Sequence, residues 1–531
     1  MRIFTKLLLF VALVAFASGI SAQNRRYLDP VFDKVKVSPL TPVASNYTVM
    51  TWIGGLLQGV PGVHTARQPL VCQFYTPDGD TRTDRPLVIY VHTGSFLPYQ
   101  INASCGGTMA DSSNVEIAKR LAKMGYVVAV VNYRQGWIPT LEQELLKRYF
   151  LINATYRGVQ DISTYVRYFR RSVADLGNPH GIDPEKITVW GQGTGGYISL
   201  ASAYLQEYNQ IFQTSDPLKF WLTPPLTPVN IPMVREQYNG LVDASGPVAT
   251  VDAQYSALNL GLPVGDTLCI PNHTGFSNRF ALCVNMGGAL GDSTWVRSGA
   301  GNPPLVSYHV KTDQYAPCET DVLNVPTTRG PEPVVEVSGS CDVSRIADRL
   351  GLNEVFKSIP AGHDPYGALS KTGRLGYYQF DNTPDDSGSP WEWQASATPK
   401  PTTDPSVTDC NTDAAKSRMY IDTIVGYFAP RACVALGLNC DFNSSVKDLT
   451  DTNVNLKMAP NPATSDVTIS VSDATPVRSW TVFDISGRMV RSNAQANTTS
   501  FVLRRDNLQN GMYLVKMQFD KGTLTKKLIF E

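Results

Sequence analysis

Glycine is concentrated in one short stretch of the chain, GQGTGG at 191–196, which follows the apolar run ITVW and precedes a segment typical of a helix. A glycine-rich turn between a strand and a helix serves one of two purposes: it lets the backbone wrap a phosphate, or it presents a nucleophile on a tight turn. A dinucleotide-binding turn follows the first strand of its fold. Here the turn follows roughly the third recognisable strand. The phosphate-binding alternative is therefore weak.

The elements that must position this turn are short apolar runs alternating with helical patterns. The runs rich in β-forming residues are LVIYVH (87–92), VVAVVNYR (127–134), ITVW (187–190), LVSYHV (305–310) and VFKSIP (355–360). Between them, Ile117, Leu121 and Met124 are spaced for one helix face. Near-continuous apolar strands separated by helices predict an α/β domain with a mostly parallel sheet covered on both faces. We expect this domain over residues 30–442, with an insertion near 205–278 that is rich in Pro, Gly, Asn and Thr.

The pattern changes after residue 443. A polar linker over 443–455 leads into short segments of alternating hydrophobicity, such as DVTISVS and GMYLVKMQF. Period-two alternation with turn residues between the segments predicts a small all-β sandwich over residues 456–531.

The N-terminus has the layout of an export signal. Arg2 and Lys6 precede an apolar run from Leu7 to Phe16, and small residues end at Ala22. This predicts a signal peptide over residues 1–22 and a secreted protein, at the cell surface or extracellular. The run is too short for a spanning helix, and no later segment is long enough, so we expect no transmembrane segment.

Charge and cysteine content exclude several classes of function. Lys plus Arg and Asp plus Glu both number 46, which gives no reason to expect nucleic acid or an anionic membrane as a partner. The nine cysteines match no zinc-binding spacing, so we expect no metal and no cofactor. In an exported chain they predict disulfides, around Cys318 and Cys341 or near Cys410, Cys433 and Cys440, with at least one thiol left unpaired.

The C-terminal stretch resembles the sorting domain of the Bacteroidota type IX secretion system. The matching segments, in order, are MAPNPATSDVTISV, VFDISGRMV, LQNGMYLVKM and the terminal GTLTKKLIFE. The resemblance implies the type IX translocon as a partner, removal of this domain after export, and a surface-attached or released product.

The region from about 70 to 370 resembles the α/β-hydrolases, in particular secreted carboxylesterase-like members. Four segments carry the resemblance in the family's chain order: YVHTGSF (90–96) for the His-Gly-Gly-Gly segment, GQGTGG (191–196) for the G-x-S-x-G elbow, YHVKTDQYAP (308–317) for the acid, and IPAGHDPYG (359–367) for the histidine loop after the last strand. The resemblance implies an α/β-hydrolase fold, Asp313 as the triad acid and His363 as the base.

The resemblance also assigns the remaining positions of the site. Gly191 and Gly195 are the elbow glycines, and Gly94, Ser95 and Thr194 belong to the oxyanion hole.

The nucleophile position of this elbow is Gly193, which has no reactive side chain. A nucleophile on such an elbow has a strained, positive φ, which glycine adopts almost without cost. Loss of the nucleophile alone costs a serine hydrolase roughly 10⁶-fold in kcat. The sequence therefore predicts a degenerate esterase that is catalytically silent or very weak and retains a ligand-binding pocket.

Two alternatives stay open. An active ester hydrolase would need water activated by His363, or Thr194 as nucleophile, although Thr194 follows the nucleophile position and should point away from His363. A surface adhesion or scaffold protein would use the fold alone. Trp391 and Trp393 lie on an expected loop and could stack on a glycan or an apolar ligand, or pack the loop onto the core. A small ester, a glycan and an apolar molecule are the ligands to expect.

Overall fold

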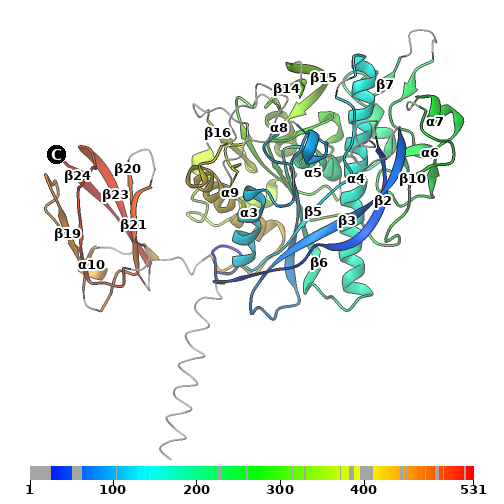
Figure 1. Ribbon diagram of the computed structural model, residues 1–531. Helices are drawn as coiled ribbons and strands as arrows, with labels where there is room; N and C mark the ends of the chain where they lie inside the picture. Colours follow the sequence, from blue (N-terminus) through cyan, green and yellow to red (C-terminus); the bar gives the residue numbers. More distant parts are fainter. Residues whose placement is uncertain are drawn as a thin grey trace, which may run out of the picture. The chain divides into compact units, whose positions relative to one another are not determined.

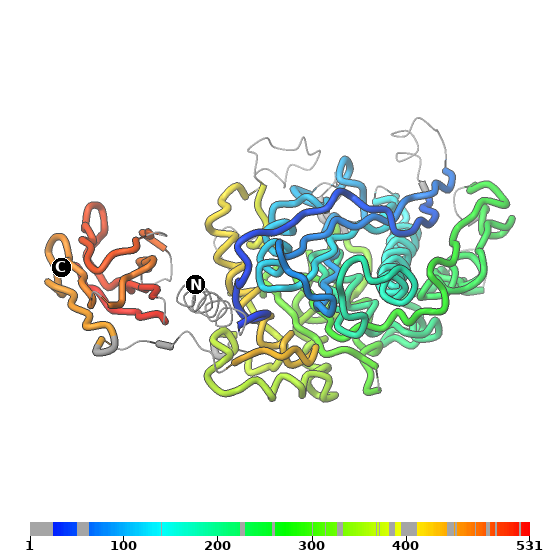
Figure 2. The backbone as a smooth tube through the Cα atoms, turned by 90° about the horizontal axis from the view of Figure 1, so that it is seen from below, coloured from blue at the N-terminus to red at the C-terminus, as the bar shows by residue number. Residues whose placement is uncertain are grey.

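The computed structural model divides the chain into two compact units, Met1–Cys440 and Asp441–Glu531, each described here by itself (Figures 1 and 2). The residues that the structure describes are 25–50, 63–102, 104–139, 141–223, 229–258, 261–299, 301–313, 315–327, 330–370, 372–381, 388–394, 411–442, 447–448, 451–472, 474–484, 489–493, 496–519 and 522–531. The predicted signal peptide lies outside them.

A nine-stranded sheet forms the centre of the first unit. Its order is β1 (Val35–Val37), β3 (His64–Pro77), β5 (Val127–Val131), β4 (Arg85–Val91), β6 (Ile182–Gln192), β11 (Leu282–Met286), β13 (Leu305–Val310) and β16 (Tyr377–Phe380), with β2 (Thr41–Met50) paired to β3. From β5 to β16 all pairs are parallel, and β1, β2 and β3 pair antiparallel. All residues of β4, β5, β11 and β13 are buried, as expected for strands covered on both faces.

Helices cover both faces of this sheet. The bounds are α3 (Ser112–Lys123), α4 (Glu144–Ala174), α5 (Thr194–Tyr204), α8 (Ser340–Arg349) and α9 (Ala414–Ala435). On one face the ring of Trp190 lies 4.8 Å from that of Phe428 in α9. On the other, Asn285 Nδ2 donates to Ser340 Oγ in α8 at 2.8 Å. Because side chains alternate along a strand, these contacts place α9 and α8 on opposite faces. The layered arrangement is the α/β-hydrolase fold predicted from the sequence (Figure 1).

The predicted insertion consists of short elements: η2 (Tyr208–Phe212), β7 (Trp221–Leu222), β8 (Ile231–Pro232), α6 (Glu236–Asn239), β9 (Ala249–Thr250), α7 (Ala253–Leu258) and β10 (Thr267–Cys269). A second excursion, after β13, forms the hairpin of β14 (Thr320–Thr327) and β15 (Gly330–Gly339), to which β12 (Ala289–Leu290) also pairs.

One predicted strand is wrong, and the error matters for the site. The run VFKSIP forms the 3₁₀ helix η4 (Glu354–Ser358) and not the last strand of the sheet. The last strand is β16, YYQF at Tyr377–Phe380, about 20 residues later. A short apolar run does not by itself distinguish a strand from a helical turn.

The second unit is built from two small sheets around one apolar core. One has the order β17 (Lys447–Asp448), β24 (Gly522–Phe530), β23 (Gly511–Phe519), β20 (Ser479–Asp484), β21 (Met489–Asn493). The other has β18 (Lys457–Ala459), β19 (Val467–Ser470), β22 (Ser500–Leu503). Alternate residues of β23, Tyr513, Val515, Met517 and Phe519, face the core, which confirms the period-two pattern read from the sequence.

Two disulfides close loops in the first unit. They join Cys318 to Cys341 and Cys433 to Cys440, and Cys105 is also disulfide-bonded. Three buried cysteines, Cys72, Cys269 and Cys283, keep free thiols. Within the described part of the chain, no helix is both long and apolar enough to span a bilayer.

Candidate active site

The elbow forms as the glycine pattern predicts. β6 ends at Gln192, Gly193 has φ +55° and ψ −119°, and α5 begins at Thr194. A Cβ on Gly191 would overlap the carbonyl of Gly195, and one on Gly195 would overlap that of Val91. Close backbone approach therefore requires glycine at 191 and 195, while glycine at 193 adopts the positive φ without the strain that a side chain would add.

The space beside Gly193 holds the side chain of Thr93. A Cβ on Gly193 would lie 2.8 Å from Thr93 Cβ and closer still to Thr93 Oγ1. Rotation about χ1 moves the hydroxyl but leaves Thr93 Cβ in place, so a side chain at 193 requires the backbone to shift. Thr93 was not among the residues expected at the site. The signal was there, because threonine stands at the first glycine of the segment that resembles His-Gly-Gly-Gly.

The predicted oxyanion loop has an unusual backbone. Gly94 has φ +133°, and the two residues after it, Ser95 and Phe96, both have φ +55°. Trp137 Nε1 donates to the Ser95 carbonyl at 2.7 Å and Leu97 N donates to Gly94 O at 2.9 Å. Two consecutive non-glycine residues at positive φ cost of order 1–3 kcal/mol each, and such strain is concentrated at binding and catalytic loops.

Thr194 is held by a neighbouring tyrosine. Its Oγ1 lies 3.0 Å from the hydroxyl of Tyr133, which follows β5, and Tyr133 also donates to Thr93 O at 3.4 Å. Burial raises the pKa of Tyr133 to about 12, so the phenol stays neutral and keeps its proton for these bonds. The Thr194 hydroxyl is thus used in packing the elbow against β5.

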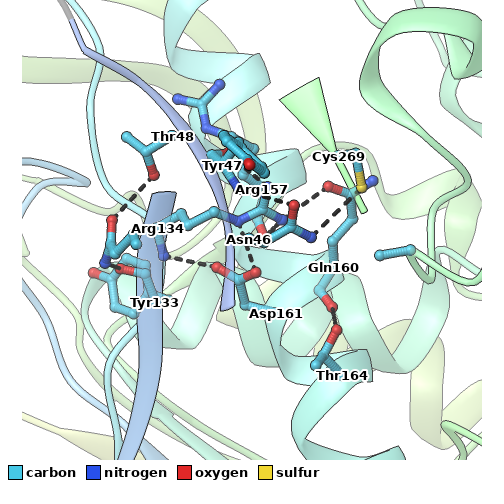
Figure 3. A network of polar contacts seen from close by, with 12 residues as sticks. Asn46, Tyr47, Thr48, Tyr133, Arg134, Arg157, Gln160, Asp161, Thr164 and Cys269 are labelled. Atoms are coloured by element: carbon cyan, nitrogen blue, oxygen red, sulfur yellow. Dashed lines mark hydrogen bonds and ion pairs between the residues drawn. The ribbon is translucent and has the colours of Figure 1, made fainter. Parts of the chain in front are cut away.

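A buried ion pair fixes the segment that carries Tyr133 (Figure 3). The next residue, Arg134, donates through Nε to Asp161 Oδ1 at 2.8 Å and through its backbone N to Asp161 Oδ2 at 2.7 Å. Arg134 also reaches Tyr47 O at 3.0 Å and Gln160 Oε1 at 3.0 Å. Both charged side chains are fully buried. The network ties β2, α4 and the end of β5 together behind the elbow.

Asp313 lies where the hydrolase fold places its acid, after β13. Its Oδ1 accepts hydrogen bonds from the backbone N–H groups of Tyr315 at 2.8 Å and Ala316 at 3.1 Å. Burial raises the pKa of Asp313, an effect that His309 partly opposes.

His363 lies at the opposite end of the sheet from Asp313, contrary to the expected pairing. β13 and β16 run parallel, with Ser307 beside Tyr377, so the loop before β16 is at the edge where strands begin. Asp364, next to His363, forms an ion pair with Arg431 of α9 at 2.7 Å. Ser417, earlier in α9, contacts the carbonyl of Glu392 near the elbow. With a rise of about 1.5 Å per residue, Ser417 and Arg431 are about 21 Å apart.

The loop that does follow the last strand carries no histidine among its described residues, 381 and 388–394. A Cβ on Gly388 would lie 2.5 Å from Asp313 Oδ2, so this loop packs directly on the Asp313 side chain. Trp391 approaches the same place: a Cβ on Gly287 would lie 3.4 Å from Trp391 Cζ2 and 3.7 Å from Asp313 Oδ2. The indole Nε1 of Trp391 is buried and has no partner among the described atoms.

Glu392 places a second carboxyl beside the elbow, which was not expected from the sequence. It accepts a hydrogen bond from Gln192 Nε2 at 2.6 Å, and the amide oxygen of Gln192 accepts from Tyr90. Burial is the main cause that raises the pKa of Glu392 to about 7, and the carboxylates of Asp111 and Asp313 add to it. Within the described part of the chain, no Lys or Arg pairs with Glu392.

The two tryptophans expected on a loop, Trp391 and Trp393, are buried. Trp391 is 0% and Trp393 is 6% exposed, and the guanidinium of Arg418 lies 5.4 Å above the Trp393 ring. They pack the loop onto the core, so stacking on a glycan from solution is not open to them. Polar and proline-rich neighbours in the sequence concealed this burial.

An apolar cavity of about 60 Å³ adjoins the elbow. Phe96 of the oxyanion loop and Tyr197 of α5 line it, together with residues of α4, the insertion and the β14–β15 hairpin. Two donors in its wall, Tyr197 Oη and Trp295 Nε1, are buried without a partner among the described atoms. No group of three or more His, Cys, Asp or Glu in the described ranges is placed to hold a metal ion.

Two segments of the chain match known families. Residues 457–531 match the secretion system C-terminal sorting domain, and residues 72–220 match BD-FAE. The chain carries an esterase-like hydrolase domain and a type IX sorting domain. The sorting domain marks it as a secreted or cell-surface protein.

The similarity to solved structures is low. The thermophilic esterase 2 of Thermogutta terrifontis with propionate bound is 12% identical, with 70% of this chain and 91% of the esterase covered and a TM-score of 0.34. The same esterase phosphorylated by paraoxon gives 13% identity, 70% and 90% coverage and a TM-score of 0.34. No curated protein matches the chain.

Proposed function

We propose that this exported hydrolase-fold protein forms no acyl-enzyme and acts by binding a small apolar ligand beside its degenerate elbow. The observation that carries the proposal is Thr93 Cβ, 2.8 Å from where a Cβ on Gly193 would stand. A nucleophilic side chain is absent and its space is taken. Without a nucleophile, a serine hydrolase loses roughly 10⁶-fold in kcat.

The placement of the other triad positions supports the same conclusion. Asp313 lies at the carboxyl end of the sheet, while His363 lies next to Asp364, whose partner Arg431 is about 21 Å along α9 from Ser417, the residue that contacts Glu392. A base must be within hydrogen-bond reach of the proton it takes, directly or through one water. His363 is therefore not the residue that would activate water at Gly193.

The ligand is expected in the cavity beside Phe96 and Tyr197. Its lining is mainly aliphatic and aromatic, which favours an apolar molecule or the acyl part of an ester over a glycan. The unpartnered Tyr197 hydroxyl and Trp295 N–H would each gain a hydrogen bond from an acceptor oxygen on that ligand.

The test combines an activity assay with a binding assay on the mature protein. Short p-nitrophenyl esters should be hydrolysed no faster than by the matched Asp313→Asn variant, and a fluorophosphonate probe should not label the wild type. Butyrate and benzoate esters should raise the melting temperature, because a ligand that binds only the native state stabilises it. Ile152→Trp, which fills the cavity, should abolish that rise, while Ile346→Trp, half-buried on α8 outside it, should not. Rapid labelling of the wild type would refute the proposal.

Glu392 favours one second candidate, slow ester hydrolysis by activated water. A carboxyl with a pKa of about 7 is suited to accept a proton near neutral pH. Any hydrolysis should then rise with a midpoint near pH 7 and disappear in Glu392→Gln. A rate that survives Glu392→Gln but falls in His363→Ala would contradict this assignment.

We further propose that the type IX translocon exports the chain through its sorting domain and that the domain is then removed. The match of residues 457–531 supports this. Deletion of 457–531 should retain the protein inside cells of a host that has this secretion system, as measured by immunoblotting of cell and culture fractions.

A further inference from the structure

We infer that Thr93 and Trp391 occupy the spaces of the missing serine and histidine side chains. The positions of a serine-hydrolase triad are then filled by other side chains and are not left empty. The inference rests on the proposed function and deepens it, because it names the two residues that close the serine-hydrolase site. Each residue is supported by its own contacts.

The Thr93 contact concerns two facing positions, 93 in the loop after β4 and 193 in the elbow. The resemblance to the His-Gly-Gly-Gly segment puts a glycine opposite the nucleophile in related enzymes, where the backbone of that loop must approach the nucleophile closely to form the oxyanion hole. Here the loop position bears a side chain and the elbow position bears none. The Thr93 side chain therefore occupies the volume between the end of β4 and the elbow that a side chain at position 193 would need.

Trp391 occupies the space of the base by topology and by contact. In the triad, the histidine comes from the loop after the last strand and lies between the acid and the nucleophile. Trp391 belongs to that loop, is 0% exposed, and lies beside Asp313 at the turn of Gly287. Gly193 N donates to Met286 O at 2.8 Å, so the same turn also touches the elbow. Trp391 thus lies beside Asp313, at a turn whose preceding residue, Met286, touches the elbow.

The space beside Asp313 is narrow. An indole is larger than an imidazole, and the loop that carries Trp391 also brings Gly388 close to Asp313. Among the described residues, Tyr315 and Ala316 donate backbone hydrogen bonds to the Asp313 carboxylate.

A double-mutant cycle tests the Thr93 contact. Gly193→Ala should lower the midpoint of thermal unfolding, and Thr93→Gly should recover much of that loss in the double variant, because the clash is removed while the positive φ remains. Independent, additive shifts would overturn the assignment of Thr93. Gly437→Ala serves as the control: it also has positive φ, at +57°, but its Cβ would meet nothing within 4 Å, so Thr93→Gly should not rescue it.

Restoration of the triad tests Trp391. The variant Thr93→Gly/Gly193→Ser/Trp391→His should react with a fluorophosphonate about 10²- to 10⁴-fold faster than Thr93→Gly/Gly193→Ser, the contribution typical of a general base. In the reaction the serine hydroxyl oxygen introduced at position 193 displaces fluoride from phosphorus, and the introduced imidazole takes the hydroxyl proton. Equal rates in the two folded variants would overturn the inference.

A single substitution keeps the inference testable if the triple variant does not fold. In Trp391→His, the pKa of the new imidazole measured by NMR should fall when Asp313 is also replaced by Asn, because the Asp313 carboxylate favours the charged imidazole and the amide does not. An imidazole pKa that is the same with Asp313 and with Asn at that position would overturn the placement. Labelling of the wild type by the probe would instead refute the proposed function, and the two failures are therefore distinguishable.

Discussion

Glu392 should make the stability of the hydrolase unit fall as pH rises towards neutrality. Its carboxyl is enclosed by the loop after β16, Gln192 and Tyr90, and the nearby charged groups, Asp111 and Asp313, are also acidic. Burial and these carboxylates favour the protonated form. The pKa rises from 4.5 to about 7 on folding.

The direction and size of this pH dependence follow from the linkage between proton binding and folding. Between the two pKa values the native state binds more protons than the unfolded state, so stability is full below pH 4.5 and is lost as pH rises through 7. At 1.36 kcal/mol per pKa unit, the loss is about 3 kcal/mol. Glu392→Gln mimics the protonated carboxyl and should remove this slope. The variant should therefore gain about 3 kcal/mol relative to wild type between pH 4.5 and pH 8.

The assay is urea unfolding of the two proteins from pH 4 to pH 9. A constant offset from the altered hydrogen bond to Gln192 does not affect the comparison of slopes. Glu116→Gln is the control, for which the difference in stability from wild type should change with pH in the opposite direction. Although burial acts to raise it, hydrogen bonds from Arg120 and Arg418 lower the pKa of Glu116, so wild type should gain on this variant as pH rises. Parallel curves for wild type and Glu392→Gln would refute the reasoning.

Three further outcomes are expected. Asp161→Asn should cost about 3–5 kcal/mol in urea unfolding, because it leaves the Arg134 guanidinium buried without its counter-charge, and a loss below 1 kcal/mol would contradict the role given to the pair. His363→Ala should leave any residual ester hydrolysis unchanged at every pH, and a fall in the rate would show that His363 reaches the elbow in solution. Replacement of Cys318 and Cys341 by serine should lower stability by about 3 kcal/mol in calorimetry, since their bond closes a loop with a sequence separation of 23, and no change would indicate that the bond does not form.

The sequence was sufficient where local pattern and global fold agree. Three of the four glycines of GQGTGG mark the elbow: close backbone approaches require Gly191 and Gly195, and Gly193 has a positive φ. LVSYHV was recognisable as β13 because a strand buried on both faces is apolar without interruption.

The sequence failed where the outcome depends on long-range packing. VFKSIP and YYQF are similarly short and apolar, and only sheet pairing distinguishes η4 from β16. Because VFKSIP was predicted to be the last strand, the loop that carries His363 was expected at the carboxyl edge of the sheet, whereas it lies at the opposite edge. The burial of Trp391 depends on contacts with Gly287, which is distant in sequence, and no local pattern encodes it.

The disulfide between Cys433 and Cys440 bears on how the protein matures. It closes a loop at the C-terminal end of α9, and the first compact unit ends at Cys440 itself. α9 packs on β13 and β16 through Tyr427 and on β6 through Phe428, so fraying from its end would reach the sheet. Removal of the sorting domain as proposed above, by a cut after Asp441, would therefore leave a chain end that the disulfide already links to α9. Such a terminus would resist exopeptidases without any refolding.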